Sequence, residues 1–409
     1  MEESLSVKRD LPRLTVTAKA ARSASGGHPW IYGTEVVSDE GDWSGGDVVD
    51  VFSEKGKYLG SGFVNGASKI RVRLISCNAN DRFDEDFFRR RVSHALDYRR
   101  TVMGGAFDCC RLVFGEADRF PGMTVDRFGD VLSVQTLCLG VDMRKDLLLG
   151  LILDDLRRSG DVINTVYLRN DSPVRALEGL AAETGFYKAD GLCETDGRTV
   201  VTENGLRFAV DYAAGQKTGF FLDQKFNRAA VGRLCRGKKV LDCFTHTGGF
   251  ALNCVKGGAE RVTAVDVSES ACGVARENAA MNGMDDRVDV VCADVFDYLE
   301  TVRRGEYDLI ILDPPAFTKS RDTVKSAARG YGEINERAMR LLGRGGYLAT
   351  CSCSHFMTAP LFRQMLHGAA ERAGVGLRQV EERRQSPDHP ILWNVPETEY
   401  LKFFIFQIV

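Results

Sequence analysis

The pattern of apolar and polar residues differs between the two halves of this chain, and the pattern of the second half is the clearer. From about residue 201 onward, short apolar runs typical of buried strands are separated by stretches with helical period. The expected strands are 240–244, 262–267, 288–293, 309–313, 347–352 and 403–409. Between the second and third of these, Ser268 is placed to cap a helix that ends near Asn282 and Gly283. Strands and helices that alternate at this spacing predict a doubly wound, mainly parallel sheet.

The N-terminal part has a strand rhythm interrupted by glycine turns. Apolar runs at 48–52, 58–64 and 70–75 are typical of a small β-rich module. From 81 to 100 the pattern changes to helical period, and mixed α and β structure continues to about residue 200. We therefore expect an α/β protein of three domains: a β-rich domain over 1–78, a central α/β domain over 79–200 and a C-terminal domain over 201–409.

Composition and charge limit the classes of partner. Of the 409 residues, 54 are Lys or Arg and 57 are Asp or Glu, which gives a net charge of −3. This balance excludes a basic coat for nucleic acid, but not a local patch. We expect such a patch from the arginines at 89–91 and 99–100, from 319–329 and from the N-terminal module. The longest aliphatic run, 147–153, is far shorter than the ~20 residues of a membrane span. With no signal peptide apparent, we expect a cytoplasmic protein.

The twelve cysteines are interpreted as reduced thiols, mostly small core residues. Cys109 and Cys110 are adjacent, and we expect a structural role for them. Because the sequence has no CxxC pair and only six histidines, we expect no metal site.

A cofactor site is predicted where the first strands of the second half end. The run 240–244 leads into Thr247, Gly248 and Gly249 and then a helix, and glycines let a backbone approach a ligand closely. Asp266 ends the next strand at close to the ~20-residue spacing expected of a carboxylate that holds ribose hydroxyls. Asp294 follows the third strand and is placed to meet an adenine edge, with Phe296 as a stacking surface.

The loop after the first strand reads T-H-T-G-G-F and lacks the G-x-G-x-x-G cradle of a dinucleotide site. Asp242, which we place in that loop, would repel a pyrophosphate but could pair with an ammonium group. S-adenosylmethionine has an amino-acid tail, a sulfonium and no phosphate, and it fits this loop better.

The fourth and fifth strands end in residues that suit covalent catalysis. Asp313 is followed by two prolines, which fix its backbone, and Cys351 lies in the segment T-C-S-C-S. C5 of a pyrimidine becomes nucleophilic when a thiolate adds at C6, so methylation at C5 needs an activated cysteine. We expect Cys351 to be the nucleophile and Asp313 to hydrogen-bond the base at N3 or N4. Cys353 is the alternative nucleophile, although it falls past the expected strand end.

Two further segments flank these residues. Residues 215–224 carry glycines, two aromatics and alternating polar groups, and we expect a flap over the cofactor that includes Phe221 and Asp223. Phe244 completes the cofactor-binding set from the glycine loop. After Asp313 comes a polar stretch with basic residues that phosphates next to a target base would meet: Lys319, Arg321, Lys325 and Arg329.

These motifs together resemble one family. The matching segments are GQKTGFFLDQ, DCFTHTGGFAL, LDPPAFTKS, ARGYGEIN and TCSCSH, with GHPWIYGTEV and FGEADRFPGMTVDRFGD upstream. They are similar to the RlmI-type 23S rRNA (cytosine-5) methyltransferases. The resemblance implies a PUA domain, a central domain and a C-terminal Rossmann-like class I methyltransferase domain that uses S-adenosylmethionine. It also implies 23S rRNA as partner, Cys351 as nucleophile, and cofactor or base contacts from these residues: Asp242, Thr247, Asp266, Asp294 and Asp313.

One position departs from the wider set of RNA cytosine-5 methyltransferases. Many of them carry a second cysteine after the proline of the fourth-strand motif, where this chain has Pro315 and Ala316. The expected activity is formation of 5-methylcytosine in 23S rRNA. The alternatives are methylation of another RNA base or an exocyclic amine, and a non-catalytic RNA-binding protein that retains the fold. The strand at 403–409 is buried either inside its own sheet or by a second copy in a homodimer.

Overall fold

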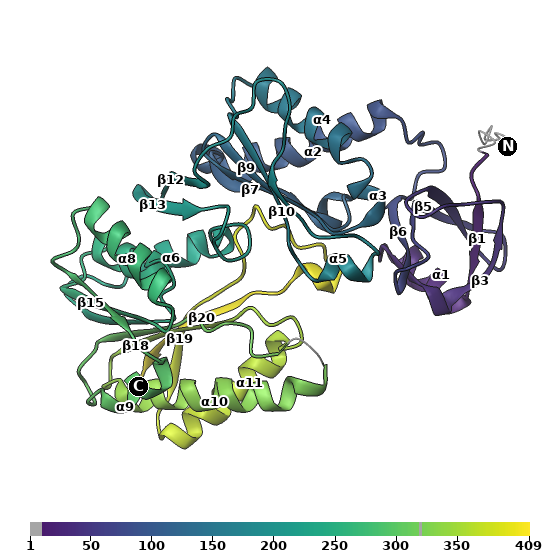
Figure 1. Ribbon diagram of the computed structural model, residues 1–409. Coiled ribbons are helices and arrows are strands. Elements are labelled where there is room, and N and C mark those ends of the chain that lie inside the picture. The colour runs from purple at the N-terminus through teal and green to yellow at the C-terminus, as the bar shows by residue number, and fades with distance from the viewer. Residues whose placement is uncertain (1–9, 319–320) are drawn as a thin grey trace. The chain divides into compact units, whose positions relative to one another are not determined.

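The computed structural model describes residues 10–318 and 321–409 (Figure 1). The chain forms two compact units, and its path passes between them several times. The first unit contains the residues up to Thr199, Val210–Phe220 and Pro387–Thr398. The second unit contains Val200–Ala209, Phe221–Ser386 and Glu399–Val409. The predicted α/β class is confirmed, whereas the division at 78 and 200 stays a prediction.

A seven-stranded sheet forms the centre of the second unit, in the order β16-β15-β14-β17-β18-β20-β19. The strands are β14 (Lys239–Cys243), β15 (Arg261–Asp266), β16 (Val288–Cys292), β17 (Leu309–Leu312), β18 (Tyr347–Ser352), β19 (Leu377–Arg383) and β20 (Lys402–Ile408). Strands β14 to β18 are parallel, and β20 is antiparallel to both of its neighbours. All six predicted strands are confirmed to within one residue at each end.

Strand β20 lies between β18 and β19, so its own sheet buries it and no second copy of the chain is needed. The edge strand β19 was missing from the predicted set. Its sequence LRQVEER is mostly charged or polar and largely solvent-exposed, which is common for edge strands because charges there prevent pairing with other chains. A search of the sequence for buried apolar runs does not detect such a polar strand.

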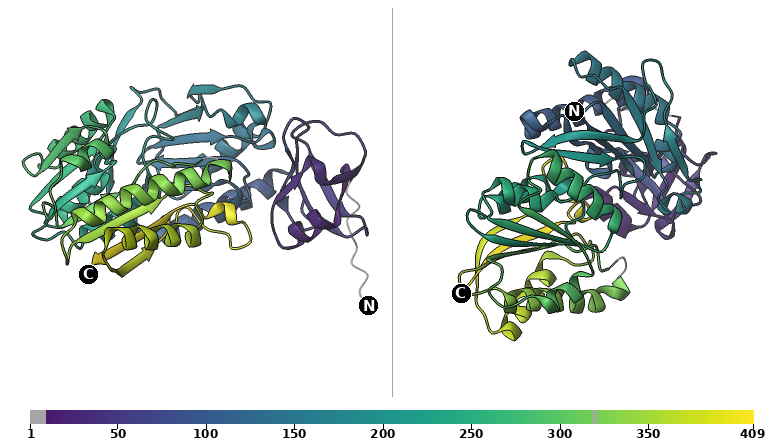
Figure 2. Two further views of the ribbon diagram at one scale, coloured as in Figure 1. Left: turned by 90° about the horizontal axis from the view of Figure 1, so that it is seen from below. Right: turned by 60° about the vertical axis from the view of Figure 1, so that its left-hand side comes forward.

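Helices cover both faces of this sheet (Figures 1 and 2). One face carries α6 (Lys225–Gly232), α7 (Gly249–Lys256) and α8 (Glu269–Met281), and the other carries α9 (Val295–Thr301), α10 (Val324–Leu341) and α11 (Ala359–Ala373). The predicted cap of α8 is confirmed, because Ser268 accepts a hydrogen bond from the N–H of Ala271 and the helix ends before Asn282. The arrangement is the doubly wound fold that the sequence predicts.

The first unit has a six-stranded sheet at its N-terminal side, in the order β2-β6-β5-β4-β1-β3. The strands are β1 (Arg13–Val16), β2 (Trp30–Tyr32), β3 (Val36–Glu40), β4 (Val48–Ser53), β5 (Tyr58–Val64) and β6 (Ile70–Ser76), with helix α1 (Ala18–Ser25). The three strands predicted here correspond to β4, β5 and β6. The others are too short or too polar to stand out in the sequence.

A five-stranded sheet follows, in the order β11-β10-β9-β8-β7. Its strands are β7 (Cys109–Phe114), β8 (Met123–Phe128), β9 (Val131–Thr136), β10 (Thr165–Asn170) and β11 (Glu183–Phe186), and its main helices are α2 (Glu85–Met103) and α4 (Lys145–Arg158). Shorter helices are α3 (Leu139–Asp142) and α5 (Val174–Leu177), and β12 (Arg198–Glu203) pairs with β13 (Leu206–Asp211). In the described residues, no helix is both long enough and apolar enough to cross a bilayer.

The predicted RNA-contacting arginines on α2 need a correction. Arg99 is completely buried, and its guanidinium pairs with Asp118 at 2.5 Å and donates to the backbone carbonyls of Arg111 and Asp388 at 3.0 and 3.1 Å. It therefore cannot reach an RNA phosphate. Arg100 has two carboxylate partners, Asp97 and Asp155, each at 2.8 Å. Both arginines hold the first unit together.

This burial leads to a stability prediction. Replacing Arg99 by Met leaves the Asp118 carboxylate buried without its ion-pair partner, so Arg99→Met should cost about 3–5 kcal/mol in the free energy of unfolding. The matched control is Arg90→Met on the same helix, because Arg90 is exposed and should change stability by no more than ~0.5 kcal/mol. Urea unfolding followed by circular dichroism measures both. Equal stability of the two variants would show that the buried pair is not important for the fold.

Candidate functional site

The carboxyl ends of parallel strands meet at one edge of an open α/β sheet, where ligands bind. In the second unit, the loop between β14 and α7 lies at this edge of the sheet. Phe244 and His246 have left-handed backbones, with φ of 63° and 51°, and Gly248 follows at 83°. Residues other than glycine are strained in the left-handed backbone conformation, and such strained residues are frequent at ligand sites. Here it is held by hydrogen bonds from His246 N to Asp266 Oδ2 (2.9 Å) and from Thr245 N to Val265 O (3.0 Å).

Asp242 lies on β14 and is fully buried, so the prediction that it lies within the loop is wrong. Its Oδ2 accepts hydrogen bonds from the Thr245 hydroxyl (2.6 Å) and the Ala251 amide (3.0 Å). Its Oδ1 has no hydrogen-bond partner in the described part of the chain. Burial raises the pKa of Asp242 to about 7, and the nearby carboxylates of Asp313 and Asp266 add to the shift.

The other predicted acids follow the neighbouring strands. Asp266 ends β15 and accepts from Ser268 N and His246 N, each at 2.9 Å. The residue after β16, Ala293, donates its N–H to the Asp266 carbonyl at 3.0 Å. Next to it, the exposed Asp294 caps α9 by accepting from Phe296 N at 2.7 Å. The ends of three adjacent strands thus bring Asp242, Asp266 and Asp294 to one edge of the sheet.

The predicted catalytic pair is also brought together. Asp313 directly follows β17, and Cys351 lies on the adjacent strand β18. The Cys351 thiol donates to Asp313 Oδ1 at 2.8 Å, and Gln224 Nε2 lies 3.1 Å from the same oxygen and 3.5 Å from the sulfur. Burial raises the pKa of Cys351 well above its usual value, and the charge of Asp313 adds to that. Burial also raises the pKa of Asp313, helped by the charge of Asp223.

Comparison with known proteins shows which family the chain belongs to. Residues 176–406 match the model of the S-adenosylmethionine-dependent methyltransferases, and residues 14–77 match a PUA-like domain. The chain is 36% identical over 402 residues to a protein of Klebsiella pneumoniae (strain 342) named ribosomal RNA large subunit methyltransferase I, covering 97% of this chain and 98% of the relative. An Escherichia coli O157:H7 protein of the same name is 35% identical over 401 residues, with 97% and 99% covered.

The chain belongs to the S-adenosylmethionine-dependent methyltransferases. The fold agrees, since a protein from Streptococcus mutans assigned to these methyltransferases superposes with a TM-score of 0.80 at 20% identity, over 97% of this chain and 99% of the other. A related structure at the same TM-score was obtained in complex with SAH. S-adenosylmethionine is therefore the cofactor of this methyltransferase.

The residues at the sheet edge fit this cofactor. Asp242 Oδ1 is a buried acceptor that no described residue uses, and the ligand's hydroxyl and ammonium groups are donors. Gly248 caps the start of α7 with φ of 83°, a backbone conformation that side chains rarely adopt. In the described residues no group of three or more His, Cys, Asp or Glu side chains could hold a metal ion.

The expected flap over the cofactor stays a prediction, and the structure shows how its C-terminal end is built. Phe221 leads into a short 3-10 turn (Leu222–Gln224) and then α6, and Asp223 and Gln224 are buried. This end of the segment is thus packed within the second unit. The Phe221 ring lies edge-on to His246 with centroids 5.0 Å apart, and Asp223 Oδ2 accepts from the Tyr400 hydroxyl at 2.6 Å.

The sequence reasoning missed a polar network behind the predicted catalytic pair. Asn227 Nδ2 donates to Gln224 Oε1 at 2.7 Å, and Arg383 Nε donates to Asn227 Oδ1 at 2.9 Å. This chain of bonds fixes the amide orientation of Gln224, so that its Nε2 faces Cys351 and Asp313. The only sequence signal was the run of polar residues that ends in Gln224.

Lys402 was also missed. It begins β20 opposite Ser352, is buried, and donates to the backbone carbonyls of Ser354 (2.6 Å) and Tyr400 (2.8 Å). Burial lowers the pKa of Lys402 to about 8, and the opposing attraction comes first from Cys353. Cys353 lies past the end of β18, as expected, and is half-exposed. A buried cation at this position favours the thiolate form of the nearby cysteines.

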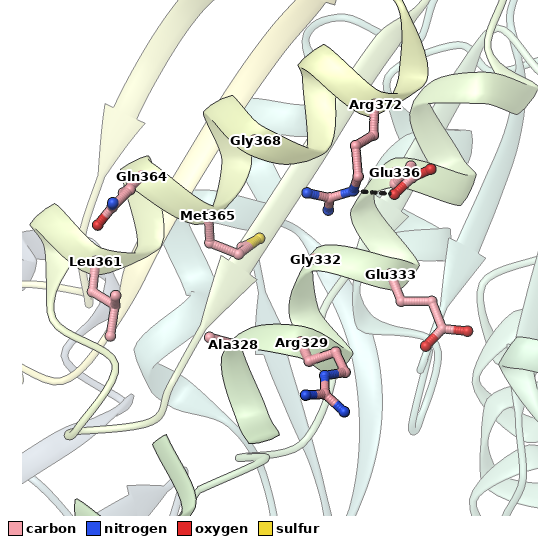
Figure 3. A pocket seen from close by; sticks show the side chains of 10 residues that line it. All are labelled: Ala328, Arg329, Gly332, Glu333, Glu336, Leu361, Gln364, Met365, Gly368 and Arg372. Carbon is pink, nitrogen blue, oxygen red and sulfur yellow. Dashed lines mark hydrogen bonds and ion pairs between the residues drawn. The ribbon is translucent and has the colours of Figure 1, made fainter. Parts of the chain in front are cut away.

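The basic stretch after Asp313 is only partly a loop. Lys319 lies outside the described residues, and so does the side chain of Arg321. Lys325 and Arg329 belong to α10 and are exposed. Arg329 lines a groove between α10 and α11, which also carries the Glu336–Arg372 ion pair at 2.6 Å (Figure 3). None of the predicted catalytic or cofactor residues lines this groove.

The buried Asp242 predicts a pH effect on stability. Its folded-state pKa of about 7 lies above the ~3.9 of an unfolded aspartate. The folded protein therefore binds a proton that the unfolded chain has lost, and this stabilisation disappears as the pH rises through 7. Between pH 5 and pH 8, the wild type should lose about 2–3 kcal/mol more unfolding free energy than Asp242→Asn.

Urea unfolding at the two pH values tests this expectation. Asp285→Asn, at an exposed position, is the control for removal of one carboxylate and should follow the wild type. Parallel pH profiles of the wild type and Asp242→Asn would contradict the buried, protonated carboxyl.

Proposed function

We propose that this methyltransferase forms 5-methylcytosine in 23S ribosomal RNA through a covalent adduct between Cys351 and C6 of the target cytosine. The relatives named ribosomal RNA large subunit methyltransferase I support the RNA substrate, and so does the PUA-like match at 14–77. The observation that carries the chemistry is the contact of 2.8 Å between Cys351 Sγ and Asp313 Oδ1. A cytoplasmic location and the three-domain division at 78 and 200 belong to the same proposal.

In this proposal Cys351 gives up a proton and Asp313 accepts it. The Cys351 thiol already donates toward Asp313, whose own pKa is raised, so the thiol proton has a nearby acceptor. Transfer of this proton leaves a thiolate and a neutral carboxyl, and the neutral carboxyl can donate to N3 of cytosine. Gln224 Nε2 faces both atoms and stabilises negative charge on whichever of them carries it.

The covalent route follows from that proton transfer. Cys351 Sγ bonds to C6, and the electron pair of the C5–C6 double bond becomes available at C5. The cofactor supplies an electrophilic methyl group on its sulfonium. Once C5 carries the methyl group, a base takes the C5 proton, the electrons of the C5–H bond re-form the C5–C6 double bond, and the C6–S bond breaks to return the thiolate. Cys351 therefore ends the cycle unchanged.

The cofactor residues are proposed from their positions. Asp242 Oδ1 and the loop with Phe244, Thr247 and Gly248 would meet the amino-acid part, and Asp266 the ribose hydroxyls. Asp294 would meet the adenine edge, with Phe296 beside it. Phe221 and Asp223 would close the site from the start of α6, since Phe221 already touches the loop at His246.

Trapping with RNA that contains 5-fluorocytosine tests the adduct. Fluorine at C5 cannot leave as the proton does, so the protein should remain bound to the RNA in a denaturing gel. Cys351→Ala should abolish the adduct and lower methyl transfer to normal RNA by at least ~10³-fold. Cys353→Ala is the matched control two residues along the chain and should retain both. Full activity of Cys351→Ala would overturn the mechanism, and loss of the adduct in Cys353→Ala alone would move the nucleophile to that residue.

The base and the RNA have a separate test. In rRNA from a strain that lacks the gene, mass spectrometry should show the loss of one 5-methylcytosine from 23S rRNA. Loss of an N-methylated nucleoside instead would favour methylation of an exocyclic amine. If the methylation of rRNA is unchanged, the alternative of a non-catalytic RNA-binding protein is favoured.

A further inference from the structure

The most exposed large apolar side chain of the described residues is Trp393, with 96% of its surface accessible to solvent. It lies in the segment Pro387–Thr398, which belongs to the first unit. Trp30 and Trp43, also in the first unit, are both half-buried. Leaving an indole in water forfeits the burial that tryptophan gives most folds, so its position calls for a function.

The exposure of Trp393 is not explained by a poorly held backbone, because hydrogen bonds fix the segment that carries it. Leu392 N donates to Thr398 Oγ1 at 2.9 Å, and Thr398 Oγ1 in turn donates to Val395 O at 2.7 Å. Val395, two residues after the tryptophan, is completely buried. The backbone on the C-terminal side of Trp393 is therefore fixed, while the indole itself points into solvent.

The segment is also tied down at both ends within the first unit. On its N-terminal side, Asp388 Oδ2 accepts from Arg111 N at 2.8 Å. On its C-terminal side, Glu397 lies 3.3 Å from His28 Nε2 in the PUA-like domain. Next to the tryptophan, Asn394 packs so closely on Gly27 that a Cβ there would lie 2.0 Å from Asn394 Nδ2. Trp393 thus stands on a rigid support beside the turn after α1.

The surroundings indicate the kind of partner. On the C-terminal side of Trp393, Asn394 and Pro396 are exposed, whereas Ile391 and Leu392 on its N-terminal side are half-buried. Arg22, in the last turn of α1 shortly before Gly27, is exposed and has no ion-pair partner in the described residues. An exposed aromatic ring suits an unstacked nucleobase, and the segment that carries it contacts the turn after α1 at Gly27, five residues after the cationic Arg22, which suits the phosphate.

We propose that Trp393 is a stacking platform for an unpaired base of the RNA substrate, with Arg22 contacting the adjacent phosphate. The proposal rests on the RNA substrate of the proposed function, but not on the cysteine mechanism. The platform lies in the first unit, whereas Cys351 and the cofactor residues lie in the second.

Three substitutions separate stacking from a simple apolar contact. Trp393→Phe keeps an aromatic face, Trp393→Leu keeps only an apolar side chain, and Trp393→Ala removes both. Base stacking on one aromatic ring is worth ~1–3 kcal/mol, so the leucine and alanine variants should bind about 5- to 150-fold more weakly. The phenylalanine variant should stay within about threefold of the wild type. Val162→Ala, at an exposed position in the same unit (65%), is the control.

Filter binding of unmodified 23S rRNA transcript to the full chain measures these affinities. Calorimetric titration with S-adenosylmethionine should give the same affinity for all variants, which shows that the second unit is intact. Equal binding by the leucine and phenylalanine variants would overturn stacking, and so would unchanged binding by the alanine variant. If the wild type itself does not bind the transcript, the RNA substrate fails together with this inference. If it binds but Cys351→Ala retains activity, only the catalytic proposal fails.

Discussion

One buried carboxylate links the end of a strand to the start of a helix, and the cofactor edge depends on it. Through a single oxygen, Asp242 accepts from the Thr245 hydroxyl and from the Ala251 amide on α7. The residues with left-handed backbones lie between Asp242 and Ala251, and Asp266 at the end of β15 accepts a further hydrogen bond from the same loop. Without these hydrogen bonds, the strain at Phe244 and His246 would relax and the loop would lose its shape. The cost of burying a carboxyl is kept low because it retains its proton near neutral pH.

The proposed catalytic pair depends on a similar arrangement at the ends of β17 and β18. Asp313 and Cys351 come from adjacent parallel strands, and their register brings sulfur and oxygen into contact. Neither group is in its reactive state when buried alone, because burial disfavours both charges. In the proposed mechanism the pair overcomes this by exchanging one proton, and the amide of Gln224 compensates the charge on either side. Asn227 and Arg383 matter because an amide can do this only when its orientation is fixed.

The sequence predicted what local rules control. Six strands and the Ser268 cap were correct because buried apolar runs and caps leave a signal within a few residues. Features built from distant residues could not be seen. The Arg99–Asp118 pair, the Gln224–Asn227–Arg383 network and the place of Lys402 each join side chains that come together only in the fold. Asp242 was assigned to the loop although the expected strand 240–244 already contained it, and the structure places it on that strand. The glycine loop drew attention to the right residues, although the reason for its shape lies elsewhere.

The path of the chain between the two units limits how the protein can be divided. Strand β20, which pairs with the cysteine-bearing strand β18, follows the Pro387–Thr398 segment that belongs to the first unit. A fragment that stops at Ser386 would contain every predicted cofactor and catalytic residue, yet it would leave β18 with an open edge and lack Lys402. A fragment that begins at residue 201 would instead carry Pro387–Thr398 away from Arg99 and Arg111. Neither fragment therefore contains a complete unit, and both units can form only from one continuous chain.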